Sequence, residues 1–130
     1  MPKDKVFIIE DDLPALESLK NLLLTSDFEV EGLSAPKEIM KSIKSFGPDI
    51  ILLDLLMPGL GGLEVCQMLN SDEQTRDVPI IVISALANPA DIKKAYELGV
   101  VDYLTKPYIY SELDKKIKKF ISYKKNRVIK

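Results

Sequence analysis

The chain has 130 residues, of which 46% are hydrophobic and 29% are charged, and its formal net charge is −2. This size and composition suit one soluble domain with a substantial core. No apolar run approaches the ~20 residues that a membrane-spanning helix needs, and the first residues lack the apolar core of a signal peptide, so no membrane span is expected. Histidine is absent and Cys66 is the only cysteine, which excludes histidine zinc ligands, histidine-based triads and an internal disulfide. A reducing cytoplasm is the expected location.

The charges are unevenly distributed along the chain. Residues 1–114 contain all 20 acidic residues and 10 basic ones, whereas residues 115–130 contain eight basic residues and no acidic one. A basic segment is compatible with nucleic-acid or membrane contact. We favour the commoner interpretation, a solvated helix face whose lysines stabilise the negative end of the helix. We therefore expect a domain over 1–124, without a direct nucleic-acid site, and a basic tail or the start of a linker over 125–130.

Five apolar segments alternate with five amphipathic ones. The predicted strands cover residues 6–9, 28–33, 49–53, 79–84 and 100–104, and the predicted helices cover 12–24, 34–46, 61–71 and 88–99 and start again at 111. The second strand alternates between apolar and polar residues, which is typical of a more exposed edge strand. Strict alternation of strands and helices predicts one doubly wound α/β domain with a parallel sheet.

Four of the five expected helix starts have side chains that can accept a hydrogen bond from an unpaired backbone amide. They are Asp12, Ser34 followed by Pro36, Asn88 followed by Pro89, and Ser111 in a capping-box-like pair with Asp114. The residues expected to face the core from these helices recur at helical spacing. They are Leu16, Leu19 and Leu23, then Ile39, Ile43 and Phe46, then Val65, Cys66 and Leu69, and last Leu113, Ile117, Phe120 and Ile121.

Reactive side chains follow four of the five predicted strands. Glu10 and Asp11 follow the first strand, Asp54 the third, Ser84 ends the fourth, and Lys106 follows the fifth. Ligands of open parallel sheets bind beyond the carboxyl ends of the strands. A single aspartate at a strand end is commonly a capping residue, but three carboxylates, a hydroxyl and a lysine at one edge are not easily explained in that way.

The chemistry open to these groups is narrow. Clustered carboxylates repel one another and need a cation or raised pKa values. Mg²⁺ is the natural partner, because it prefers carboxylate, water and phosphate oxygens. One carboxylate, Asp54, could then attack a phosphoryl group and carry it as an acyl phosphate, with Lys106 as countercharge and Ser84 as hydrogen-bond donor. The sequence therefore predicts a site for aspartyl phosphorylation.

Four motifs carry a family resemblance: IIEDD at 8–12, ILLDLLMPGLGG at 51–62, VISA at 82–85 and DYLTKPY at 102–108. Through them the chain resembles, over nearly its whole length, the receiver domain of two-component response regulators. The resemblance implies a flavodoxin-like fold with strand order 2-1-3-4-5, which places Glu10 and Asp11 beside Asp54. It also implies a role for each matching position. Glu10 and Asp11 resemble the metal-binding acidic pair, Asp54 resembles the phosphoacceptor, and Leu56 resembles the residue whose backbone carbonyl binds Mg²⁺. Ser84 resembles the switch hydroxyl and Tyr103 the switch aromatic. Lys106, which would precede a cis Pro107, resembles the phosphate-binding lysine.

The function implied by this resemblance is that of a phosphoacceptor signalling module and not of an enzyme. Its phosphoryl donor would be a sensor histidine kinase or a phosphotransfer protein. Phosphorylation would switch the surface formed by the fourth helix, fifth strand and fifth helix, which is also the candidate surface for a homodimer. The resemblance does not identify the downstream effector.

The chain departs from the usual family pattern at a few positions. Glu10 replaces a more frequent aspartate, and Gly61 stands where many members have aspartate. The glycines of GLGG at 59–62 are interpreted as turn residues that admit positive φ. Leu56 and Leu86 occupy two variable positions that overlook the phosphoryl group in this family.

Two other functional classes stay open. A receiver fold that no longer switches would act only as a binding module, although the complete set of carboxylates, hydroxyl and lysine argues against it. A phosphohydrolase with an aspartyl nucleophile would need a second aspartate two residues further on as general acid, and that position is Leu56.

Overall fold

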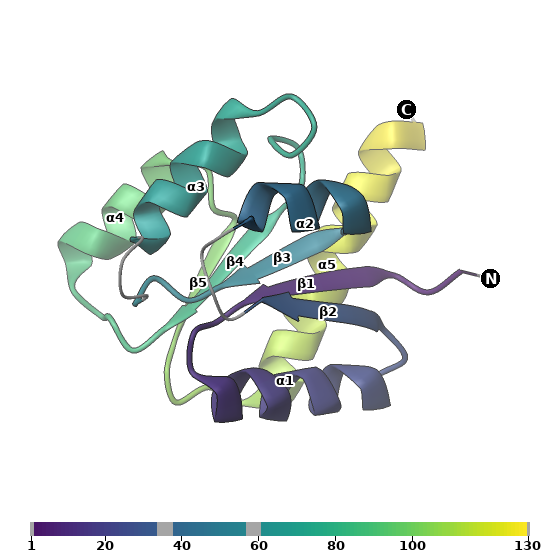
Figure 1. The fold of residues 1–130 in the computed structure, drawn as a ribbon, viewed down its shortest axis with the longest axis horizontal. Coiled ribbons are helices and arrows are strands. Elements are labelled where there is room, and N and C mark those ends of the chain that lie inside the picture. The colour runs from purple at the N-terminus through teal and green to yellow at the C-terminus, as the bar shows by residue number, and fades with distance from the viewer. Residues whose placement is uncertain (1, 34–37, 57–60, 130) are drawn as a thin grey trace.

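The computed structural model describes residues 2–33, 38–56 and 61–129, and the side chains from residue 124 onward are outside this description. Strands and helices alternate in the expected order (Figure 1). The elements are β1 (Lys5–Ile9), α1 (Leu13–Thr25), β2 (Glu29–Leu33), α2 (Ile39–Phe46), β3 (Ile50–Leu53), α3 (Gly62–Ser71), β4 (Ile80–Ser84), α4 (Pro89–Glu97), β5 (Asp102–Thr105) and α5 (Tyr110–Ile129).

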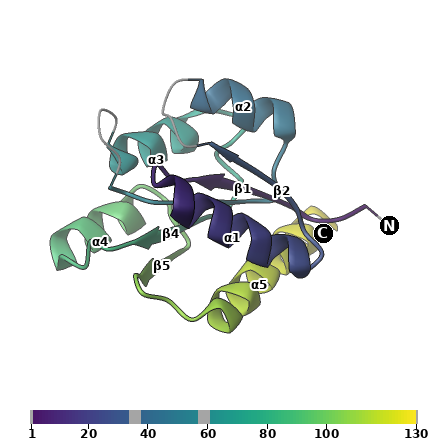
Figure 2. The same cartoon turned by 60° about the horizontal axis from the view of Figure 1, so that its bottom comes forward.

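The five strands form one parallel sheet with the order β2-β1-β3-β4-β5, which confirms the predicted fold. In Figure 1 the strands run away from the side on which the two termini are labelled, so their carboxyl ends share the opposite edge. Helices α1 and α5 cover one face of the sheet and α2, α3 and α4 cover the other (Figures 1 and 2). The order reverses between β1 and β3, which is the place where parallel sheets of this kind bind ligands.

The buried strands explain why their sequences do not alternate between apolar and polar residues. Alternate side chains point to opposite faces, and here both faces are covered by helices. In β3, Ile50 and Leu52 pack toward α1 and α5, whereas Ile51 and Leu53 pack toward the other three helices. The edge strand β2 is more exposed, as predicted.

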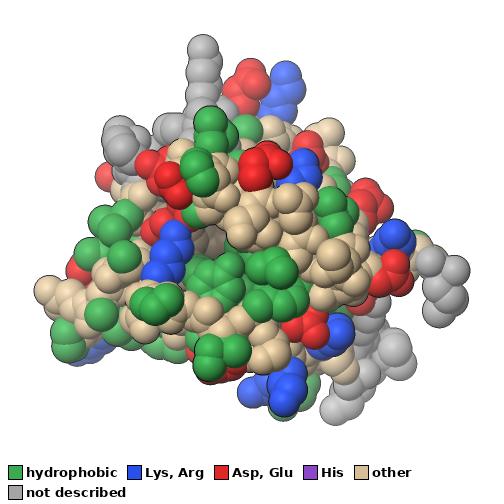
Figure 3. Space-filling view, turned by 90° about the horizontal axis from the view of Figure 1, so that it is seen from below, with side chains coloured by type: hydrophobic (Ala, Val, Ile, Leu, Met, Phe, Trp, Pro, Cys, Tyr) green, Lys and Arg blue, Asp and Glu red, His purple; other side chains and the backbone are tan. Residues whose placement is uncertain are grey.

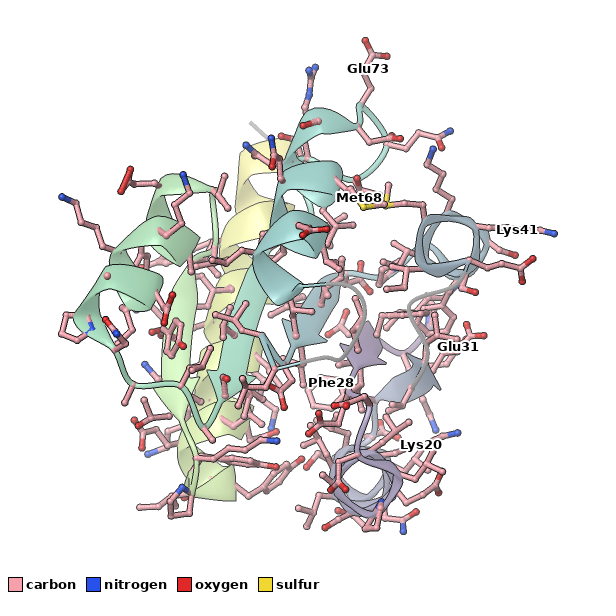
Figure 4. All side chains as sticks on the ribbon, turned by 60° about the vertical axis from the view of Figure 1, so that its left-hand side comes forward. Lys20, Phe28, Glu31, Lys41, Met68 and Glu73 are labelled. Carbon is pink, nitrogen blue, oxygen red and sulfur yellow. The ribbon has the colours of Figure 1, made fainter. Side chains whose placement is uncertain are left out.

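The apolar helix residues predicted to face the core all pack against it, with Phe46 and Phe120 partly buried. The charged side chains of the same helices turn outward; Figure 4 shows Lys41 on α2 and Glu73 beyond α3 pointing away from the sheet. The N-caps at Asp12 and Asn88 are confirmed. Their carboxylate and amide oxygens accept hydrogen bonds from the amides of Ala15 (3.1 Å) and Ala90 (2.8 Å). The expected start of α2 at residues 34–36 lies outside the described residues.

The starts of β5 and α5 differ from the predictions. β5 begins at Asp102, because the Val100 amide still bonds to the carbonyl of Ala95 at the end of α4 (3.2 Å). The capping box at Ser111 is wrong. Helix α5 begins at Tyr110, and the Leu113 amide bonds to the carbonyl of Ile109 (3.2 Å), so Ser111 lies inside the first turn.

A tertiary contact anchors the first residue of α5. The Tyr110 hydroxyl donates to the Leu22 carbonyl (3.1 Å) and shares a hydrogen bond with the Ser26 hydroxyl (2.6 Å), which ties the first residue of α5 to the end of α1. Asp114, the other residue of the expected capping box, instead pairs with Lys118 (2.9 Å). At its other end α5 continues to Ile129, so the backbone of the basic segment is helical.

Candidate functional site

The carboxyl ends of β1 and β3 bring three carboxylates together. The two strands are neighbours with Ile9 opposite Leu53, so the residues that follow them, Glu10 and Asp54, are also adjacent. Glu10, Asp11 and Asp54 each place a carboxylate oxygen within 4.8 Å of the other two. Glu10 is only 5% exposed and Asp54 only 7%. Such burial of like charges requires a compensating cation or proton.

Lys106 brings a positive charge to the cluster from the end of β5. Its Nζ donates to Glu10 Oε1 (2.5 Å) and to Asp54 Oδ2 (3.1 Å), and its side chain is 29% exposed. The Lys106 amide donates to the Ser84 carbonyl (2.8 Å), and the peptide bond to Pro107 is cis, as the family resemblance implied. The lysine is therefore held between two carboxylates at the edge of the sheet.

The Asp54 amide and both of its carboxylate oxygens have hydrogen-bond partners. Its amide donates to the Ile9 carbonyl (3.0 Å), its Oδ1 accepts from the Leu56 amide (2.9 Å), and its Oδ2 accepts from Lys106. The Leu56 side chain does not take part and is 47% exposed. The backbone thus fixes the orientation of the Asp54 carboxylate before any ligand binds.

The surroundings move the pKa values of the two buried carboxyls in opposite directions. Burial, and then the contact with Asp54, raises the pKa of Glu10 to about 7 despite the nearby Lys106. Burial also acts to raise the pKa of Asp54, but the contacts with Glu10, the Leu56 amide and Lys106 outweigh it and hold this pKa below its usual range. The pKa of Lys106 is raised, because its bonds to both carboxylates outweigh the effect of burial. Asp54 is therefore the carboxyl of the pair that loses its proton first as the pH rises.

A second group of residues lies at the end of β4 and on β5. Ser84 is fully buried, and its hydroxyl accepts from the Leu86 amide (3.2 Å). The Tyr103 hydroxyl donates to the Leu86 carbonyl (2.7 Å), and its ring packs against the core beside α4. Partial burial raises the pKa of the Tyr103 phenol. The loop after β4 thus joins Ser84 to Tyr103 through the backbone of Leu86.

A cleft of about 550 Å³ opens beside the carboxylates, between α1 and the segment that follows β5. Figure 3 shows a hollow on this face of the molecule, bordered by hydrophobic side chains. Its polar lining includes Glu10, Asp12, Asp54, Lys106 and Ser18. The site is therefore open to a reactant from outside.

Comparison with known protein families places most of the chain in a single family. Residues 6–118 match the model of the response regulator receiver domain. The chain belongs to this family. Among its relatives are the protein RcaC of Microchaete diplosiphon, 35% identical over 114 residues, and the probable transcriptional regulator ycf27 of Porphyridium aerugineum, 34% identical over 118 residues. The aligned parts cover 88% and 91% of this chain but 18% and 48% of those proteins, so the chain spans about half of their length or less.

Solved structures agree with the receiver-domain assignment. A putative response regulator from Chloroflexus aurantiacus superimposes with a TM-score of 0.86 at 27% identity, over 94% of this chain and 99% of that one. The signal receiver domain of a histidine kinase from Syntrophus aciditrophicus gives 0.83 at 28% identity, over 92% and 90%. Receiver domains are signalling modules of two-component systems, as the sequence motifs predicted. Within the described residues, no helix of this receiver domain has the length and hydrophobicity to cross a membrane.

Sequence reasoning misread the glycines of this receiver domain. Gly61 has a φ of −67° and Gly62 is the first residue of α3, whereas the positive φ values among the described glycines occur at Gly47 (65°) and Gly99 (97°). Gly59 lies outside the described residues. The sequence analysis also did not predict that α1 lines one side of the cleft. The signal was present, because a helix that starts directly after the acidic pair must border the site.

Proposed function

We propose that this receiver domain accepts a phosphoryl group on Asp54 in a Mg²⁺-dependent reaction and passes the signal on through the surface formed by α4, β5 and α5. The observation that carries the proposal is the pairing of an ionised, oriented Asp54 with Lys106, inside a cluster of carboxylates that is incompletely compensated. The donor would be a sensor histidine kinase or a phosphotransfer protein.

The carboxylate cluster fits a divalent cation. Glu10 Oε1 already accepts from Lys106, but the buried Glu10 Oε2 has no hydrogen-bond partner among the described residues. An orphaned buried oxygen is costly unless a ligand satisfies it. Mg²⁺ prefers such oxygen ligands, and Glu10, Asp11, Asp54 and the Leu56 carbonyl would hold it. When bound, the ion would neutralise charge on the transferring phosphoryl group.

In the proposed reaction a carboxylate oxygen of Asp54 attacks the phosphorus of the donor. The new O–P bond forms as the bond between phosphorus and the donor's leaving atom breaks, and the leaving atom keeps the electron pair. Lys106 is placed to move from the carboxylate to a phosphoryl oxygen, where its charge stabilises the transition state. Glu10 would hold the ion as a carboxylate, so a bound ion would favour the ionised form of Glu10.

The switch would run from Ser84 to Tyr103. A phosphoryl oxygen on Asp54 would draw the Ser84 hydroxyl toward it, and Tyr103 would exchange its 2.7 Å bond to the Leu86 carbonyl for an inward position. One such hydrogen bond contributes about 1 kcal/mol, so a modest preference of the phosphate for one state shifts the population. The affected surface would include Lys93, Lys94, Glu97, Tyr103 and Lys115, and a homodimer through this surface is part of the proposal.

The phosphorylation test is intact mass spectrometry with acetyl phosphate as donor. The wild type should gain one phosphate in Mg²⁺, and excess chelator should abolish the gain. Asp54→Asn should gain none, whereas Asp49→Asn, which changes an aspartate at the opposite end of β3, should behave as wild type. A gain in Asp54→Asn or in chelator would contradict the proposal.

The switching test is NMR with beryllofluoride, a phosphoryl mimic. Amide signals of α4, β5 and α5 should shift along with those around Asp54, and Tyr103→Ala should confine the shifts to the neighbourhood of Asp54. Shifts confined to Asp54 in the wild type would support the non-switching binding module instead. Light scattering with and without the mimic reports the proposed dimer.

A further inference from the structure

Helix α3 begins in direct contact with the backbone of the residue after Asp54, and this contact leaves no room for a side chain at position 62. A Cβ on Gly62 would lie 2.3 Å from Leu55 Cα, 2.8 Å from Leu55 Cδ2 and 2.9 Å from the Asp54 carbonyl oxygen. At the preceding position, a Cβ on Gly61 would meet nothing closer than Glu64 Oε1 at 3.7 Å. The two adjacent glycines therefore differ sharply in what a methyl group would do.

Two of the three atoms that a methyl group at position 62 would meet, Leu55 Cα and the Asp54 carbonyl oxygen, belong to the backbone and cannot simply turn aside. The Gly62 amide donates to the Leu55 carbonyl (3.2 Å), and the Asp54 amide donates to the Ile9 carbonyl of β1 (3.0 Å). The backbone of residues 54 and 55 is thus held by β1 on one side and by the start of α3 on the other. We infer that Gly62 is a positioning residue for Asp54, because its missing side chain lets α3 seat against Leu55 and so sets where the Asp54 carboxylate stands relative to Lys106.

The size of the expected displacement follows from the contact distances. Ordinary contacts of a Cβ begin at 3.4 Å, whereas the Cβ on Gly62 would lie 2.3 Å from Leu55 Cα, so an alanine requires a shift of about 1 Å. Such a shift of Asp54 would stretch its 3.1 Å bond to Lys106 beyond hydrogen-bonding range. A 1 Å misplacement of a reacting group can slow a reaction about 100-fold. Helix propensity acts in the opposite direction, since alanine is the better helix former.

The expected loss of phosphorylation rate rests on the proposed function, whereas the expected displacement of Asp54 does not. The experiment compares Gly62→Ala with Gly61→Ala and with Leu69→Ala, which removes a fully buried side chain of α3 away from the site. Circular dichroism first establishes which variants are folded, and only the folded variants are assayed. The rate of phosphorylation by acetyl phosphate with Mg²⁺ should fall about 100-fold in Gly62→Ala, and should stay within about twofold of wild type in the other two.

A second readout separates positioning from general destabilisation and from failure of the proposed function. The Leu56 amide bonds to Asp54 Oδ1, so its NMR signal should shift in Gly62→Ala and stay in place in Gly61→Ala and Leu69→Ala. A wild-type rate with an unmoved Leu56 amide in Gly62→Ala would overturn the inference, as would an equal loss of rate in Leu69→Ala. If the wild type itself is not phosphorylated, the proposed function fails and the Leu56 amide decides the inference alone. If Gly62→Ala does not fold, Leu55→Ala is used in its place, because it loosens the same contact without adding an atom. The rate of phosphorylation should then fall by less than in Gly62→Ala, and the NMR signal of the Leu56 amide should shift.

Discussion

Replacing Lys106 with methionine tests whether the lysine compensates the buried carboxylates. The side chain donates two charge-assisted hydrogen bonds, to Glu10 at 2.5 Å and to Asp54 at 3.1 Å. Breaking a buried ion pair costs about 3–5 kcal/mol, because the remaining charge is left unpaired. Lys106 is 29% exposed, and Glu10 can take up a proton, so we expect the lower end of that range. The predicted loss is about 3 kcal/mol of the free energy of unfolding, or roughly 10 °C in Tm.

The assay is urea denaturation followed by circular dichroism, in chelator and in saturating Mg²⁺. The loss should be largest in chelator and smaller in Mg²⁺, because a bound divalent cation would compensate the same carboxylates. Lys118→Met is the matched control. Lys118 pairs with Asp114 at 2.9 Å but is 60% exposed, so its removal should leave the free energy of unfolding almost unchanged. If Lys106→Met costs no more than Lys118→Met, or costs the same with and without Mg²⁺, the reasoning about charge compensation is wrong.

Three further predictions concern stability at high pH, the life of the phosphorylated state and the anchoring of α5. Burial raises the pKa of the Cys66 thiol from 9.0 to about 12, so the unfolded chain loses this proton at a lower pH than the folded chain. The free energy of unfolding of the wild type should therefore fall by about 1 kcal/mol by about pH 10. Parallel urea titrations of Cys66→Ala should not show this fall. Leu56 and Leu86 cannot hydrogen-bond an attacking water, so phosphate loss should be slow in wild type and roughly tenfold faster in Leu56→Asn/Leu86→Glu; an unchanged decay would show that these side chains do not control water access. Tyr110→Phe should cost about 1–2 kcal/mol through its lost hydrogen bonds to α1, whereas Tyr123→Phe, at a position 56% exposed, should be neutral; equal effects of the two changes would contradict the anchoring role.

The sequence by itself determined the order of elements and the set of reactive residues. Local signals were sufficient there, because an apolar run such as 50–53, bounded by turn residues and repeated between amphipathic helices, is typical of a parallel sheet that helices cover on both faces. The Asp12 carboxylate caps a helix through an amide three positions away, so the information lies within one turn. Reactive residues at strand ends were readable for the same reason, since parallel strands all present their carboxyl ends to one edge.

Only the tertiary structure decided features that depend on residues far apart in the chain. Lys106 and Glu10 are separated by 96 positions, and the protonation of Glu10 depends on burial that no local pattern encodes. Helix α5 begins at Tyr110 and not after the local capping signal at Ser111, and the Tyr110 hydroxyl anchors this start to Ser26 at the end of α1, 84 positions away. The role of Gly62 was hidden for the same physical reason: a glycine needed for close packing and one needed for positive φ look alike in sequence, and only the position of the neighbouring backbone distinguishes them.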